Sequence, residues 1–111
     1  MEVKVFKVEQ LAGQVAAQGL QAVRVVPRGY ADLTDQFRRS VTSVALNTAE
    51  GCQRKGADRQ QILRVALGSA REASMALRLL VAVDAVAAAQ ASDIEAGLDE
   101  VRAMLWVLAN R

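Results

Sequence analysis

Three arginines recur at intervals of seven residues in the middle of the chain, at Arg64, Arg71 and Arg78. Seven residues make nearly two turns of an α-helix, so in a helix the three guanidinium groups would emerge along one line, about 10 Å apart. Arginine binds phosphate in a bidentate manner, and such a line could follow a nucleic-acid backbone. Alternatively, the three arginines could pair with carboxylates of a helix predicted over about residues 92–109, in the same subunit or in a neighbour. We call these three residues the arginine ladder.

The charge of the chain is distributed unevenly around the ladder. Residues 38–78 hold eight Lys/Arg and three Asp/Glu, whereas residues 84–100 hold five acids and no base. The basic part favours an anionic ligand, and the acidic part offers a partner for the ladder. No aromatic residue is interleaved with the ladder in the sequence, which leaves the stacking of bases on aromatic rings unsupported.

Catalytic chemistry is not expected, because the chain contains no histidine and one cysteine. The commonest general base, the Ser-His and Cys-His pairs and most metal sites are therefore missing. No Walker loop or GxGxxG fingerprint occurs. The carboxylates of Glu95 and Asp99 share a helix face, as solvated pairs often do. We predict no enzyme activity, no cofactor, no metal and no small-molecule substrate, and we interpret Cys52 as an incidental small residue.

Four helices must carry these side chains, over about residues 5–25, 33–50, 58–83 and 92–109. Each segment has apolar residues at spacings of three and four, and short breaks separate the segments. Short connections make neighbouring helices antiparallel. The sequence therefore predicts an all-α protein, an antiparallel up-down four-helix bundle, with residues 1–111 in a single domain. The predicted helix starts and stops rest on Asp32, on Gly51, on Asp58 with Gln61, and on Ser92 with Glu95.

The compartment is predicted from what the sequence lacks. A single cysteine forms no internal disulfide, and the N-terminal residues lack the apolar core of a signal peptide. The longest uncharged run, residues 10–23, is shorter than the roughly 20 apolar residues that span a bilayer. We expect a cytoplasmic protein that does not contact a membrane.

Trp106 is the candidate for a subunit interface. On a helix it shares a face with Arg102, Asp99 and Glu95, which is a largely polar surround. A tryptophan in such a place either lies over the edge of a neighbouring helix or is buried between subunits.

The second predicted helix resembles a known family. The run LTDQFRRSVTSVALNTAEGCQR, Leu33 to Arg54, is similar to the signature of the bacterial four-helix bundle proteins. That family was first noticed as reading frames in intervening sequences of large-subunit ribosomal RNA genes. A related branch includes the accessory variability protein of diversity-generating retroelements. The run ALGSAREA resembles a second, weaker motif of the family. The matching residues that we interpret as structural are Gln36, Ser43, Asn47, Glu50, Gly51, Gly68, Ser69 and Glu72.

The resemblance implies a bundle that assembles into a ring, typically a homopentamer, with a role in nucleic-acid association and no enzyme activity. The chain departs from the family at Ala45, where proline is frequent, and at Gln60, Gln61 and Arg64, where aromatic residues are frequent. The departures favour a straighter second helix and argue against a surface that depends on those aromatics.

The motif residues have two interpretations. In the first they fix the corner between the second and third helices: Glu50 pairs with Arg54 across a turn at Gly51, and Asn47 bonds loop backbone. Lys55 and Arg59 are then solvated. In the second, basic side chains form a rim that touches RNA or DNA. The rim residues would be Arg38, Arg39, Arg54 and Lys55.

Together these features predict a non-catalytic homo-oligomer, most simply a pentamer, that associates with RNA or DNA. It could serve as an accessory to a larger RNA or reverse-transcriptase machine. The alternative is a structural assembly module that binds a protein partner and no nucleic acid.

Overall fold

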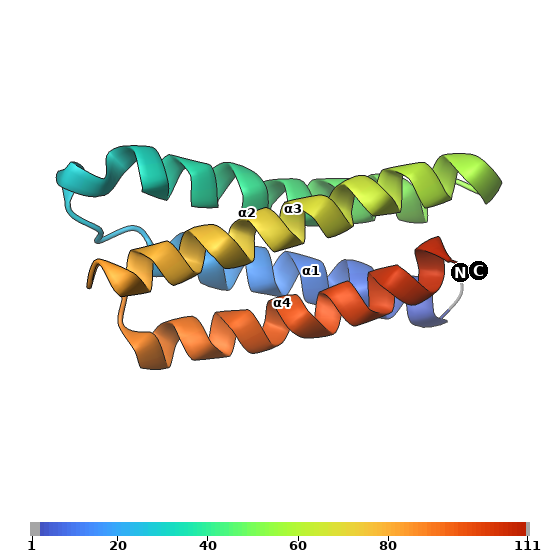
Figure 1. Ribbon diagram of the computed structural model, residues 1–111. Helices are drawn as coiled ribbons and strands as arrows, with labels where there is room; N and C mark the ends of the chain where they lie inside the picture. The colour runs from blue at the N-terminus through green and yellow to red at the C-terminus, as the bar shows by residue number, and fades with distance from the viewer. Residues whose placement is uncertain (1–2, 111) are drawn as a thin grey trace.

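The computed structural model describes residues 3–110, which form four long α-helices and one short 3₁₀ helix, with no strand. The α-helices are α1 (Val3–Ala22), α2 (Ala31–Cys52), α3 (Gly56–Ala82) and α4 (Ala88–Ala109), and the 3₁₀ helix η1 (Arg28–Tyr30) leads into α2. Each α-helix packs against the next in sequence, and α1 also packs against α4, which closes an antiparallel bundle (Figure 1). The predicted four-helix bundle is confirmed.

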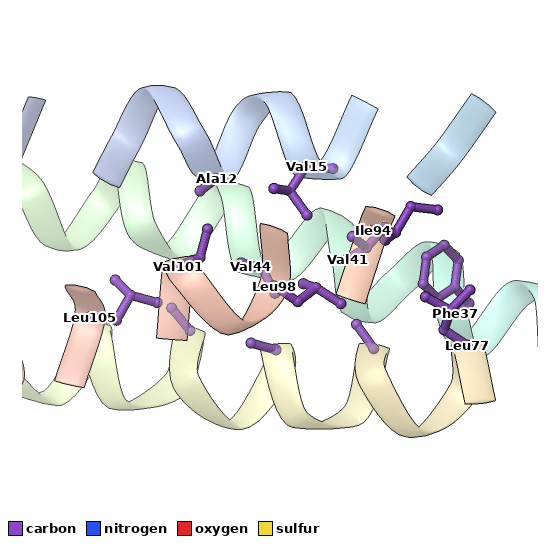
Figure 2. Close-up of a cluster of buried hydrophobic side chains, with 14 of the residues drawn as sticks. Ala12, Val15, Phe37, Val41, Val44, Leu77, Ile94, Leu98, Val101 and Leu105 are labelled. Carbon is purple, nitrogen blue, oxygen red and sulfur yellow. The ribbon is translucent and has the colours of Figure 1, made fainter. Parts of the chain in front are cut away.

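The core explains why these segments pair. In every helix the buried residues step by three and four along the sequence, the spacing of a coiled-coil seam. Figure 2 shows part of this core between the four ribbons. The seams are Val5, Val8, Ala12, Val15, Gly19 and Ala22 of α1; Thr34, Phe37, Val41, Val44, Thr48 and Gly51 of α2; Leu63, Ala66, Ala70, Ala73, Leu77 and Leu80 of α3; and Ala91, Ile94, Leu98, Val101, Leu105 and Leu108 of α4.

Three glycines allow neighbouring helices to approach closely. At each of them an added Cβ would overlap a side chain of another helix, so the missing side chain is a packing requirement. The Cβ positions would lie 2.8 Å from Phe37 at Gly19, 2.5 Å from Leu63 at Gly51 and 2.6 Å from Val15 at Gly97.

The predicted caps of α2 are wrong. Asp32 lies inside the first turn of α2, and Tyr30 at the N-cap makes no side-chain capping bond. Gly51 was expected to end the helix, but α2 continues to Cys52. The glycine is needed because Leu63 occupies the space of its side chain, and not because the helix stops there.

The predicted starts of the third and fourth helices, a capping box of Asp58 with Gln61 and one of Ser92 with Glu95, are also wrong. Helix α3 begins at Gly56, whose φ of 60° suits glycine, and α4 begins at Ala88, so both proposed boxes lie inside helices. Helix α3 ends because Asp84 adopts a left-handed φ of 60° and the amide of Ala85 donates to the carbonyl of Leu80 at 2.8 Å. The residues after Asp84 therefore turn back toward α4 and do not extend α3.

None of the helices within residues 3–110 is long and apolar enough to cross a membrane.

Candidate nucleic-acid interface

The arginine ladder lies along the exposed side of α3, as its spacing predicts. Arg78 Nε is 3.6 Å from Glu95 Oε1 of α4, and this contact is the ladder's single ion pair among residues 3–110. Arg64 and Arg71 have no carboxylate partner in the described part of the subunit. Pairing with the subunit's own acidic helix therefore accounts for one of the three arginines.

An open hollow of about 400 Å³ lies where α3 faces α4, and the ladder contributes Arg71 to its wall. Trp106 lines the same hollow and is 61% exposed. Arg102 Nη1 is 3.3 Å from Asp99 Oδ1, and both residues also line the hollow. Leu67 and Ala103 complete the lining. No aromatic residue is interleaved with the ladder in the sequence, but the fold brings Trp106 of α4 into the same hollow as Arg71.

The pairing of α3 with α4 explains this proximity. Ser74 of α3 donates its hydroxyl to Glu95 of α4, with both carboxylate oxygens at 2.7 Å. Because the helices are antiparallel, a step of seven residues back along α3, to Leu67, matches a step of seven forward along α4, to Arg102. Trp106 then lies one further turn along, at the Arg64 end of the ladder. Sequence spacing within one helix carries no information about this register.

At the corner between α2 and α3, the predicted pairing of Glu50 with Arg54 is confirmed. Arg54 Nη2 and Nε donate to Glu50 Oε1 at 2.6 and 3.1 Å, and the hydrogen bond to Glu50 raises the pKa of the guanidinium. Arg59, expected to be solvated, instead donates to the backbone oxygens of Gly51 at 3.3 Å and Cys52 at 3.0 Å. Both carbonyls belong to the last turn of α2, where no intrahelical amide follows; the Gly51 carbonyl also accepts from the amide of Arg54 at 3.0 Å.

Three other motif residues form a polar link between α2 and α3. The hydroxyls of Ser43 and Ser69 are 2.7 Å apart, and Asn47 Nδ2 donates to Ser43 Oγ at 2.9 Å and to the Ser43 carbonyl at 3.0 Å. The expectation that Asn47 bonds loop backbone is therefore wrong. The link joins α2 and α3 within the helices themselves, and not at the corner between them.

The remaining motif residues lie outside the core. Gln36, Gly68 and Glu72 are exposed, and an added Cβ at Gly68 would meet nothing within 4 Å. Packing inside the subunit thus explains Gly51 but not Gly68.

The proposed basic rim is not a single surface. Arg38 and Arg39 lie in the first half of α2, whereas Arg54 and Lys55 follow its end, roughly 20 Å further along the axis. Arg38 Nη1 pairs with Asp35 Oδ1 at 3.5 Å, and Arg54 pairs with Glu50. The ladder is therefore the stronger candidate for an extended anion-binding surface.

Cys52 is half-buried near the start of α1, and its thiol donates to the carbonyl of Val5, with a sulfur–oxygen distance of 3.7 Å. Burial, and secondarily the carboxylate of Glu9, raises the pKa of the thiol from 9.0 to about 11, against the opposing charge of Arg59. The thiol is thus protonated at neutral pH and is a poor nucleophile. Among residues 3–110, no group of three or more His, Cys, Asp or Glu side chains could hold a metal ion.

Comparison with known proteins gives one family and one fold. The family model of the 23S rRNA-intervening sequence protein matches residues 4–107. A solved protein of unknown function from the S23 ribosomal protein family of Bacteroides thetaiotaomicron superposes with a TM-score of 0.89 at 22% identity, covering 98% of this chain and 100% of the other. No curated protein matches the chain. At this identity the solved structure supports the four-helix bundle and no specific activity.

Proposed function

This chain belongs to the 23S rRNA-intervening sequence protein family, and from that membership we propose that it is a non-catalytic, cytoplasmic, self-assembling protein that associates with nucleic acid. The proposed assembly is a homopentamer. The proposed biological role is that of an accessory to a larger RNA or reverse-transcriptase machine.

The observation that best supports nucleic-acid association is that two arginines of the ladder are exposed and unpaired within the described part of the subunit. Arg64 and Arg71 are exposed on one side of α3 and have no ion pair among residues 3–110. An unpaired guanidinium can neutralise a phosphate without first breaking an internal salt bridge, and the released counterions favour binding. The regular spacing along a rigid helix suits a repeating phosphate backbone better than a single compact anion.

Replacing Arg64, Arg71 and Arg78 together with glutamine tests this proposal. Binding to RNA or DNA should weaken uniformly across sequences, and the slope of log affinity against log salt should fall by about one unit for each lost phosphate contact. The fold should survive, since glutamine is a good helix former and the three sites lie outside the core. A matched control replaces the exposed Lys4, Lys7 and Arg24 with glutamine, which removes the same charge from another region.

The alternative, an assembly module that binds protein alone, is favoured by exposed apolar side chains. Leu46 of α2 and Val65, Met75 and Leu79 of α3 are each about half exposed or more. If the ladder serves that role by meeting carboxylates of a neighbour, the triple variant should dissociate the oligomer. Light scattering on the same sample separates the two functions. An intact oligomer with unchanged nucleic-acid affinity would refute both roles for the ladder.

A further inference from the structure

We propose that the face shared by α3 and α4 binds single-stranded nucleic acid, with a base stacked on the indole ring of Trp106 and phosphates on the neighbouring arginines. This inference rests on the proposed nucleic-acid association and adds the form of the ligand and the residue that recognises it.

Trp106 has the exposure that a stacking platform needs. It is 61% exposed, and it lines the α3–α4 hollow together with Arg71 and Arg102. Leu67 and Ala103 add apolar surface to the lining of the hollow. The aromatic ring and two guanidinium groups thus converge on one open depression large enough for a flat ring to enter. Stacking of bases on aromatic side chains tolerates any sequence, because every base has a π-face.

The charge of this face favours an anion despite its two carboxylates. Asp99 is paired with Arg102 at 3.3 Å, and Glu95 is held by the Ser74 hydroxyl and by Arg78. Both carboxylates are therefore engaged by groups inside the subunit. The charges left over are those of Arg64, level with the turn where the register places Trp106, and of Arg71, about two turns further along α3. A strand that stacks on Trp106 would have one cation beside the ring, at Arg64, and a second further along α3, at Arg71.

A single strand fits this arrangement better than a duplex does. In a duplex the bases already stack on one another, so an indole ring on a protein surface meets only backbone and groove edges. In a single strand a base can be turned outward to meet the ring while its flanking phosphates follow the arginines. Trp106 should therefore discriminate between the two forms, whereas the arginines should bind both.

Trp106 is the only tryptophan of the chain, so the intrinsic fluorescence of the protein reports on this one residue. The experiment titrates the full-length protein with a 20-nucleotide oligo-dT, an oligo-U of the same length, a 20-base-pair duplex and inorganic polyphosphate. We expect both single strands to quench the fluorescence. Duplex and polyphosphate should compete for binding through the arginines but leave the fluorescence nearly unchanged.

Two variants separate stacking from hydrophobic contact. Trp106→Leu keeps apolar surface but cannot stack, and should weaken single-strand binding by about 5- to 150-fold, the factor that corresponds to one stacked base. Trp106→Tyr keeps an aromatic ring and should recover most of the affinity. Duplex affinity should be the same in both variants, and the oligomer should retain its mass in light scattering.

The outcomes distinguish the two proposals. If wild-type protein binds none of the nucleic acids, both proposals fall. If the ladder variant loses affinity but Trp106→Leu binds single strands as wild type does, nucleic-acid association stands and stacking is refuted. Stacking is also refuted if Trp106→Leu dissociates the oligomer, or if acrylamide fails to quench Trp106 in the assembled protein, because the ring is then a subunit contact.

Discussion

The thiol of Cys52 shows how local burial determines the reactivity of a single group. Its pKa of about 11 follows mainly from burial against α1, and little thiolate exists at neutral pH. We predict that Cys52 of the folded protein reacts with iodoacetamide at pH 8 much more slowly than the same thiol in denaturant, because the thiolate is the nucleophile. Equal rates in the two states would show that the thiol is open to solvent.

The same shift should make stability depend on pH. The folded state holds the thiol proton more tightly than the unfolded state, whose pKa is near 9.0. The contribution of Cys52 to the free energy of unfolding is therefore complete below pH 9 and is lost as the pH rises toward 11. Denaturant titrations of wild type and Cys52→Ser at pH 8 and 10.5 measure it: the wild type should lose more stability over this interval than the variant does.

Single residues also mark the limits of what the sequence predicts. The pairing of Glu50 with Arg54 was predictable, because both side chains lie four residues apart on one chain segment. The capping role of Arg59 was not, since its partners are backbone carbonyls of the preceding helix. The proximity of Trp106 to Arg71 likewise depends on how α3 aligns with α4, which the Ser74–Glu95 contact reflects.

At the scale of the helix, hydrophobic spacing predicted the elements better than capping residues predicted their ends. The row Ile94, Leu98, Val101, Leu105 and Leu108 is wholly buried in α4, as its spacing indicates. In α3 the seam passes through Leu63, and its steps of three and four continue from there to Leu80. Capping signals failed because the same polar residue types also occur inside helices, where they serve other contacts, as Glu95 does with Ser74.

Substituting alanine at two glycines separates the effect of packing on stability from the effect of helix propensity. Gly51→Ala should destabilise the bundle by about 1–2 kcal/mol, because the overlap with the fully buried Leu63 outweighs the better helix propensity of alanine. Gly13→Ala in α1 is the matched control: open space surrounds that Cβ, so the subunit should gain about 0.5–1 kcal/mol. Urea unfolding measures both. A stabilised Gly51→Ala would mean that Leu63 moves aside at little cost.

At the scale of the whole molecule, the four helices form a complete core, but α3 carries a second apolar row on its outward side. The core seam of α3 faces inward. Outward, Val65, Gly68, Glu72, Met75 and Leu79 again step by three and four. Four of these five positions are apolar or glycine, and the arginine ladder runs alongside them. A second seam of this spacing, flanked by charges, is the pattern by which helices associate with further helices.

This outward seam is the physical basis for expecting self-assembly. Within residues 3–110, no other part of the subunit covers its exposed apolar side chains. A neighbouring chain could bury them, and Gly68 would let the two backbones approach closely. We predict by light scattering an oligomer, five copies of the 11.9 kDa chain, at micromolar concentration. Val65→Glu with Leu79→Glu should reduce it to smaller species while leaving the helical content unchanged, since neither side chain belongs to the core.

The control for this variant is Val25→Glu, at an apolar residue that is 87% exposed in the turn after α1 and distant in sequence from the seam. It adds a carboxylate to exposed apolar surface without changing α3, so the oligomer should persist. If the oligomer of the α3 double variant has the same mass as that of the wild type, the subunits associate through another face. The outward seam would then be a surface for a different protein partner. A monomeric wild type would refute self-assembly itself, and the seam, the ladder and Trp106 would all face solvent in the active form.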